Sequence, residues 1–167
     1  LGYGDGDEAT VVGYGGNHGR SQALEQVLAA AKLVHGEKIF FILVGDGPEK
    51  AARQEKATLL ELDNLKFLPS QSRERMAAVQ SCWDLAIVPL RDIPLFDGAR
   101  PSKMFELMAG GIPFIFCGRG EGATLAEASG CAMVVPPQNP ERLAEAVRQF
   151  AALSPADRAR MGSSGRA

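Results

Sequence analysis

Apolar residues follow two patterns that alternate along the chain. Short continuous apolar runs, of which IFFILV at 39–44 is the longest, are typical of strands buried on both faces of a sheet. Between these runs, apolar residues recur every three or four positions, as they do along one face of a helix. The two patterns predict strands over 10–12, 38–44, 65–68, 85–90, 114–117 and 133–135. They predict helices over 24–34, 48–60, 73–82, 102–110, 123–129 and 142–153.

Strands and helices that alternate in this order predict a parallel sheet with helices on both faces. Six strands joined by right-handed crossovers form a doubly wound, Rossmann-like α/β domain. The carboxyl ends of its strands share one rim, and glycine-rich loops follow several of the strands, so a ligand is expected at that rim. The closing segment MGSSGRA, 161–167, is expected to be ordered only at its start.

The composition of the chain argues against two kinds of site, a nucleic-acid-binding surface and a metal site. Charged residues make up 23% of the chain and the net charge is −2, so no nucleic-acid-binding surface is expected. The three cysteines (Cys82, Cys117 and Cys131) form no CxxC pair, and with only two histidines no metal site is predicted. We expect these cysteines to be buried, reduced thiols of a cytoplasmic protein. The chain begins at Leu1 without a signal-peptide pattern, so we expect it to be a piece of a longer protein.

The glycine-rich stretch GYGGNHGR, 13–20, is predicted to join the first strand to the first helix. Glycines there allow backbone N–H groups to approach a pyrophosphate, and the positive end of the following helix adds to the attraction. The spacing misses the dinucleotide-binding pattern G-x-G-x-x-G by one residue, and a turn without ligand contact is the alternative. In the second glycine turn, GDGP at 45–48, positive φ at Gly45 and Gly47 is a sufficient explanation.

The stretch PSKMFELMAGGIP, 101–113, predicts a helix with a polar pair on one side. Its core-facing residues are expected to be Met104, Phe105, Leu107 and Met108. Ser102 is expected to cap the helix and to leave first-turn N–H groups open to an anion, beside the charge of Lys103. Glu106 could accept hydrogen bonds from two neighbouring hydroxyls, such as those of a ribose. An exposed Lys103–Glu106 ion pair without a ligand explains the spacing equally well.

Seven segments, taken in order, resemble the C-terminal domain of the family 4, or group 1, glycosyltransferases, which are enzymes with the GT-B fold. The segments are Tyr-x-Gly-Asn-x-Gly-x-x-Gln at 14–22, LVGDGP, NLKFLP, DLAIVPL, PSKMFELMAGGIP, GEGATLAEASG and VVPPQNPERLAEAV. Within the family, the chain is similar to bacterial sugar transferases of surface-polysaccharide assembly. In these enzymes this domain binds the nucleotide-sugar donor, and a separate N-terminal domain binds the acceptor.

The resemblance implies roles for residues of the 101–113 stretch. Glu106 matches the second glutamate of the family's Glu-x7-Glu motif, which holds the donor ribose. Gly98 stands where the first glutamate is expected, so contacts to the transferred sugar are in doubt. Ser102 and Lys103 match the helix start beside the diphosphate.

In the first glycine loop, many relatives hold phosphate with an arginine and a lysine. Here those positions correspond to Asn17 and Gln22, with Arg20 as the nearest replacement. The loop FLPSQS, 67–72, matches the segment whose backbone reads the base. The predicted donor site comprises Gly15, Gly16, Asn17, Gly19, Arg20, Gln22, Pro69, Ser70, Ser102, Lys103 and Glu106, with Lys103 and Glu106 as the catalytic residues.

The resemblance implies that residues 1–167 are the donor-binding domain of a retaining hexosyltransferase in bacterial polysaccharide or glycolipid synthesis. Its partners would be a nucleotide-diphosphate sugar and, through an N-terminal domain outside this chain, a glycan or lipid-linked acceptor. No cofactor is expected. The implied location is the cytoplasm, and peripheral association of the full-length protein with the inner face of the membrane is left open. The sequence does not specify the base, the sugar, the acceptor or the oligomeric state.

Two other functions are open at this stage. The glycine loop also fits a dinucleotide-binding oxidoreductase domain, although its spacing counts against that function. Gly98 in place of a glutamate fits a non-catalytic nucleotide-sugar-binding module, against which Lys103 and Glu106 argue. Without an acceptor domain, the isolated chain is expected to be inactive as a transferase.

Overall fold

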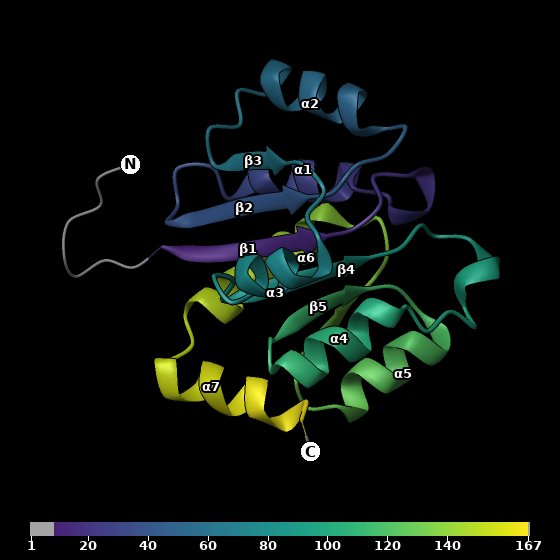
Figure 1. Cartoon of the computed structure of the whole chain (residues 1–167), viewed down its shortest axis with the longest axis vertical. Coiled ribbons are helices and arrows are strands. Elements are labelled where there is room, and N and C mark those ends of the chain that lie inside the picture. The colour runs from purple at the N-terminus through teal and green to yellow at the C-terminus, as the bar shows by residue number, and fades with distance from the viewer. Residues whose placement is uncertain (1–8, 167) are drawn as a thin grey trace.

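The computed structural model describes residues 9–166, which form a six-stranded, all-parallel sheet with helices on both faces (Figure 1). The strands are β1 (Thr10–Gly15), β2 (Ile39–Val44), β3 (Leu65–Leu68), β4 (Leu85–Pro89), β5 (Phe114–Cys117) and β6 (Ala132–Val135). Their order is β3-β2-β1-β4-β5-β6, so the winding reverses between β1 and β4. This confirms the predicted fold class. The predicted domain, 1–167, also includes residues 1–8 and 167, which lie outside the described part of the chain.

The helices of residues 9–166 divide between the two faces of the sheet. They are α1 (Glu25–Leu33), α2 (Lys50–Leu59), α3 (Arg73–Gln80), α4 (Ser102–Gly110), α5 (Gly120–Ala128), α6 (Pro140–Ala151) and α7 (Pro155–Ser164). Helices α1 and α6 pack together against one face, where Leu28 and Phe150 are fully buried. Helices α3, α4 and α5 cover the other face. Within this part of the chain, no helix combines the length and the apolar character needed to cross a membrane.

Strand β1 is longer than the sequence predicts because its glycines face bulky side chains. The β-branched run suggests an end at Val12, but the strand continues to Gly15. A Cβ at Gly13 would lie 1.9 Å from the Trp83 ring, and one at Gly15 would lie 2.4 Å from the Met76 methyl carbon. Glycine is therefore required at these two positions because side chains of other elements pack against the strand, and not because the chain turns there.

The end of the chain forms a helix that the sequence does not predict. The expectation that residues 161–167 are ordered only at their start is wrong, because α7 continues to Ser164. The Ser154 hydroxyl caps the helix by accepting a hydrogen bond from the Asp157 N–H at 3.1 Å. Gly162 packs on the end of α4, where an added Cβ would lie 2.3 Å from the Gly111 carbonyl oxygen. Contact with α4, which is distant in sequence, thus helps to hold this polar segment.

Two predictions about individual side chains are also wrong. The helical spacing places Phe105 in the core, but its side chain is 49% exposed, because α4 turns Met104 and Leu107 toward the sheet instead. The cysteines are predicted to be buried, yet Cys82 lies at the surface after α3. The other two cysteines are buried, as predicted.

The turn after β2 is in close contact with the end of β1. Gly45 has a φ of 142° and Gly47 a φ of 155°, which confirms the predicted positive φ. A Cβ at Gly45 would lie 1.8 Å from the Gly16 carbonyl oxygen. The two strand ends can therefore meet only because position 45 has no side chain.

Replacement of Gly45 by alanine should be much more destabilising than the same change at Gly36. Gly36 also has positive φ, 85°, but none of the described residues comes within 4 Å of a Cβ built there. Backbone strain alone should cost roughly 1–2 kcal/mol at Gly36. At Gly45 the clash with the Gly16 carbonyl is added, so we expect a loss of roughly 3–5 kcal/mol. Urea unfolding measures both values, and equal losses would contradict the close contact of the two strand ends.

Candidate functional site

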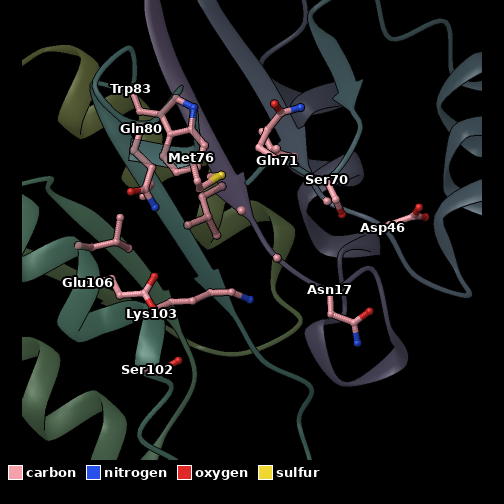
Figure 2. A pocket seen from close by; sticks show the side chains of 17 residues that line it. Asn17, Asp46, Ser70, Gln71, Met76, Gln80, Trp83, Ser102, Lys103 and Glu106 are labelled. Atoms are coloured by element: carbon pink, nitrogen blue, oxygen red, sulfur yellow. The ribbon is translucent and has the colours of Figure 1, made fainter. Parts of the chain in front are cut away.

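A cleft of about 390 Å³ opens at the carboxyl ends of β1 and β2, between the glycine loop (residues 16–19) and helices α3 and α4 (Figure 2). The lining also includes Ala86 and Ile87 of β4, so the cleft lies beside the boundary between β1 and β4, where the winding of the sheet reverses and ligands of doubly wound folds bind. One side of the cleft is polar and carries Lys103 and Glu106 from α4. Another side is apolar and carries Met76 and Trp83. The charged and the apolar parts of one ligand can therefore bind on different sides of the cleft.

Lys103, in the first turn of α4, extends its side chain toward the glycine loop (Figure 2). Its Nζ donates a hydrogen bond to the Tyr14 Oη at 3.3 Å and lies 4.8 Å from the centre of the Tyr14 ring. A Cβ at Gly16 would lie 2.3 Å from the same Nζ. Burial lowers the pKa of Lys103, whereas the nearby Glu106 raises it. A partly dehydrated cation interacts strongly with an anion that enters the cleft.

Helix α4 begins without the serine cap that the sequence predicts. Pro101 occupies the N-cap position and Ser102 is the first helical residue, and no side chain caps the helix. The capping prediction is wrong because the extended backbone of Pro101 already precedes the helix. Ser102 nevertheless lines the cleft, and first-turn N–H groups lack partners within a helix. The positive end of α4 thus adds to the charge of Lys103.

Glu106 follows Lys103 by three residues on α4, and its exposed side chain lines the cleft. Lys103 directs its hydrogen bond to Tyr14 rather than to Glu106. The arrangement therefore favours a carboxylate that is open to the cleft over a simple surface ion pair. Its role toward a ligand stays a prediction.

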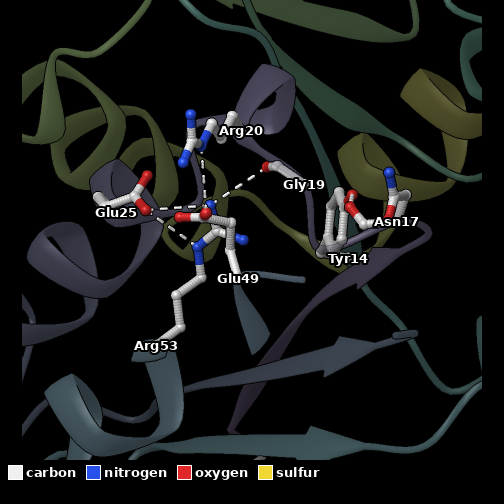
Figure 3. A network of polar contacts seen from close by, with 7 residues as sticks. All are labelled: Tyr14, Asn17, Gly19, Arg20, Glu25, Glu49 and Arg53. Carbon is white, nitrogen blue, oxygen red and sulfur yellow. Dashed lines mark hydrogen bonds and ion pairs between the residues drawn. The ribbon is translucent and has the colours of Figure 1, made fainter. Parts of the chain in front are cut away.

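Buried polar contacts fix the shape of the glycine loop (Figure 3). The Tyr14 hydroxyl donates to the Asn17 carbonyl at 2.6 Å. From α2, the Arg53 Nη2 donates to the Gly19 carbonyl at 3.2 Å and pairs with Glu25 of α1 at 3.0 Å. Arg53 is only 2% exposed, so removal of Glu25 would leave a buried charge without compensation. The spacing of residues in the sequence gave no sign of this anchoring role.

The structure brings most of the predicted donor-site residues to the cleft. Its lining includes Gly15, Gly16, Asn17, Ser70, Ser102, Lys103 and Glu106. The predicted residues outside this lining are Gly19, Arg20, Gln22 and Pro69. The side chain of Arg20 is 80% exposed and pairs with Glu49 at 3.4 Å, so it does not replace a cation in the cleft. Gly19, Arg20 and Gln22 lie outside the lining because the chain turns away after Asn17, whereas Pro69 directly precedes Ser70 of the lining.

The apolar side of the cleft contains residues that the sequence patterns did not reveal. Met76 and Gln80 come from α3, and Trp83 precedes β4 (Figure 2). The Trp83 ring lies against Gly13 and is 7% exposed. Gly13 and Gly15 alternate along β1, and the sequence has a single tryptophan. This pattern was a signal that a bulky side chain packs over the strand. Such a surface suits a planar base.

Metal ions in proteins are held by groups of acidic, cysteine and histidine side chains. In the described part of the chain, no group of three or more of them is placed to hold a metal ion. Burial raises the pKa of the Cys117 thiol, which is inaccessible in the sheet. The expectation that the protein needs no metal and no cofactor is not tested by these observations and stays a prediction.

The sequence matches one family model and two curated relatives. The family model, described as glycosyl transferases group 1, matches residues 4–167. A putative colanic acid biosynthesis glycosyl transferase of Escherichia coli, WcaI, is 31% identical over 146 residues, which are 86% of this chain and 36% of that protein. A probable glycosyltransferase of Pseudomonas aeruginosa, WbjE, is 30% identical over 144 residues, which are 83% of this chain and 35% of that protein. The chain thus spans about a third of the length of these curated relatives.

Solved glycosyltransferase structures share the fold of the chain. The catalytic domain of cholesterol-α-glucosyltransferase from Helicobacter pylori superposes with a TM-score of 0.78 at 14% identity, and the match covers 94% of each chain. The Anabaena protein HepE, in complex with UDP and glucose, gives a TM-score of 0.78 at 19% identity, covering 95% of this chain and 43% of that one. At such identities the likeness shows the fold alone, which is one Rossmann-like half of the GT-B fold.

His18 is fully buried behind the wall of the cleft. Its ring lies edge-on to Tyr14, with centroids 5.7 Å apart, and its centroid is 5.9 Å from that of Phe67. Burial lowers the pKa of His18 to about 4, and the charges of Lys50 and Arg53 add to the effect. The glycine loop is therefore built around a neutral imidazole.

Acid should destabilise the protein partly through His18. The pKa is about 4 in the folded chain against an ordinary value of 6.5, so the unfolded state takes up the proton first as the pH falls. The stability that depends on a neutral His18 is complete above pH 6.5 and is lost between pH 6.5 and about 4, by up to about 3 kcal/mol. Urea unfolding near neutral pH and near pH 4 should show that His18→Leu removes this loss. His35→Leu, a surface change, is the control, and an unchanged pH dependence in His18→Leu would contradict the buried neutral state.

Proposed function

The chain belongs to the group 1 glycosyl transferases, and from this premise we propose that it is the domain that binds the nucleotide-diphosphate sugar donor. The cleft at the carboxyl ends of β1 and β2 is the observation that supports the proposal most. A partly buried lysine, a carboxylate and an apolar surface surround one space there. These three features suit the diphosphate, the ribose and the base of a donor.

Lys103 and the positive end of α4 are proposed to hold the diphosphate. Gly15 and Gly16 keep side chains away from this part of the cleft. When the bond between sugar and diphosphate breaks, the departing diphosphate carries increasing negative charge. A fixed ammonium and a helix end stabilise such charge more in the transition state than in the ground state, which is what lowers a barrier. Lys103 is on this proposal a catalytic residue that stabilises the leaving group.

Glu106 is proposed to hold the ribose. A carboxylate can accept hydrogen bonds from two neighbouring hydroxyls, and bonds to an ionised acceptor are the stronger kind. Glu106 and Lys103 lie on the same helix, so ribose and diphosphate would lie side by side along α4. The base would then face Met76 and Trp83, beside the loop that contains Pro69 and Ser70.

The full-length enzyme is proposed to be a retaining hexosyltransferase of bacterial polysaccharide or glycolipid synthesis. The relative in Escherichia coli is named for colanic acid biosynthesis, and a structure with the same fold holds UDP and glucose. A glycan or lipid-linked acceptor would bind to a further domain, since the chain spans about a third of its curated relatives. We also propose a cytoplasmic location, with peripheral association at the inner face of the membrane.

A non-catalytic nucleotide-sugar-binding module is the second candidate, and Gly98 is the observation that favours it. This residue has no side chain, and nothing lies within 4 Å of a Cβ built there. Among residues 9–166, no side chain thus fills the place where the family motif has a glutamate. Both candidates bind the donor, so transfer of sugar by the full-length protein separates them.

Calorimetric titration tests donor binding and the role of Glu106 together. We expect UDP-glucose or GDP-mannose to bind the chain in preference to NADH, which an oxidoreductase domain would bind. Glu106→Ala should weaken this binding by roughly 1.5–3 kcal/mol, the range for hydrogen bonds to charged groups. The free energy of unfolding should change little, because the side chain is exposed. Glu127→Ala, which removes an exposed carboxylate from α5, is the matched control and should leave affinity unchanged.

Preference for NADH would contradict the proposed function. Unaltered affinity of Glu106→Ala, with sugar nucleotide still bound by the unchanged chain, would remove the ribose contact alone. Lys103→Met would then test whether the diphosphate contact survives.

The isolated chain should fold, bind donor weakly and transfer no sugar. Transfer requires alignment of an acceptor hydroxyl with the donor and exclusion of water, which closure between two domains supplies. One domain can bind the donor and stabilise the leaving group, but it supplies only one of the two walls of the closed site. The measurement is release of nucleotide from donor in the presence of lipid-linked acceptors. Turnover comparable to that of the full-length enzyme would show that the acceptor machinery lies in this chain.

A further inference from the structure

Tyr14 connects the lysine of the cleft to the glycine loop. It is the penultimate residue of β1 and is fully buried. Its ring belongs to the core under α1 and α6, whereas its hydroxyl reaches the polar contacts behind the cleft (Figure 3). Tyr14 does not line the cleft itself. Tyr14 can therefore influence a ligand in the cleft only through the residues that it contacts.

Chemistry fixes the direction of the two hydrogen bonds at the Tyr14 hydroxyl. An ammonium group has donors and no acceptor, so Lys103 donates to the Tyr14 oxygen at 3.3 Å. The hydroxyl hydrogen is then committed to the Asn17 carbonyl, 2.6 Å away. Burial raises the pKa of Tyr14, so the hydroxyl keeps the proton that this second bond needs. The hydroxyl thus ties a side chain of α4 to the backbone of the glycine loop.

Two further features restrict where the Lys103 ammonium can stand. It lies 4.8 Å from the centre of the Tyr14 ring, within the range of cation–π attraction. On another side it occupies the space that Gly16 leaves open, where a Cβ would lie 2.3 Å from Nζ. A free lysine side chain has many rotamers, and ordering them on binding costs affinity. The tyrosine and the glycine remove much of that cost in advance.

We propose that Tyr14 is a positioning residue, which holds the Lys103 ammonium at the place where the diphosphate of the donor binds. This inference rests on the proposed donor-binding function. The ammonium has three donor hydrogens, so a bond to Tyr14 leaves two for phosphate oxygens. Among the described residues that line the cleft, Lys103 is the only lysine or arginine. The strength of diphosphate binding therefore depends on where this one cation stands.

A double-mutant cycle separates a positioning role from a general structural one. Tyr14→Phe keeps the ring and removes the hydroxyl, and Lys103→Met removes the cation. Calorimetry with UDP and GDP measures the affinity of the unchanged chain, both single variants and the double variant. When Lys103 is present, we expect Tyr14→Phe to weaken diphosphate binding by about five- to twentyfold. In the Lys103→Met background the same change should alter affinity by less than about twofold, because the residue acts through the lysine.

Thr10→Val is the matched control for the loss of a buried hydroxyl. Thr10 lies at the opposite end of β1, is 3% exposed and accepts a hydrogen bond from Arg158 at 3.4 Å. Its removal should leave the affinity for UDP and GDP unchanged. Urea unfolding of each variant shows that the compared proteins are folded.

Lys103→Arg tests the same proposal if Tyr14→Phe fails to fold. Arginine keeps the positive charge, but its planar guanidinium is larger than the ammonium that stands between Tyr14 and Gly16. We therefore expect Lys103→Arg to bind diphosphates nearly as weakly as Lys103→Met. Affinity equal to that of the unchanged chain would show that charge alone is sufficient and would overturn the inference.

The possible failures are distinguishable. If the unchanged chain binds neither UDP nor GDP nor their sugar derivatives, the proposed function fails, and the inference fails with it. If Lys103→Met weakens binding but Tyr14→Phe does not, only the role of Tyr14 is wrong. Equal effects of Tyr14→Phe with and without Lys103 would assign the tyrosine a structural role instead.

Discussion

The cleft depends on one contact, in which the backbones of β1 and β2 meet just beyond the sheet. Gly45 lies against the Gly16 carbonyl with no side chain between them. The next residues extend the contact, since the His18 N–H donates to the Asp46 carbonyl at 2.8 Å. The glycine loop is therefore part of the rigid framework of the sheet rather than a free connection. Lys103 can approach Gly16 closely because the loop is held in this way.

Two cations near the loop, Lys50 and Arg53, bind backbone carbonyl groups. Lys50 donates to the Gly45 carbonyl at 2.7 Å and to the Leu68 carbonyl at 3.1 Å, and Arg53 donates to the Gly19 carbonyl. A carbonyl dipole accepts a hydrogen bond without cancelling the charge of the donor, in contrast to a carboxylate. The charge of Lys50 is thus largely retained behind the cleft, whereas Arg53 pairs with Glu25 and Arg20 with Glu49. Lys50 thus adds to the attraction of Lys103 for an anion without touching it.

Local patterns predicted the strands and most of the helices, because a strand buried on both faces has to be apolar throughout. They failed where distant partners decide the structure, as for Gly13 and Gly15, which remain in β1 because they face Trp83 and Met76. Within the site, Lys103 and Glu106 were selected through the resemblance to the family, because their spacing on one helix fits a surface ion pair equally well. Tyr14 acts on a residue 89 positions away and Arg53 on one 34 positions away, so neither contact has a local signal.

Trp83 gives the protein an optical property that follows directly from its position. It is the sole tryptophan of the sequence, and its indole forms part of the cleft lining. Indole emission changes in colour and intensity with the polarity of its surroundings and with stacking of another ring. Light at the red edge of the protein's absorption excites tryptophan, so the fluorescence comes from one known position inside the candidate site. The chain carries its own fluorescent reporter of occupancy, without a chemical label or an engineered residue.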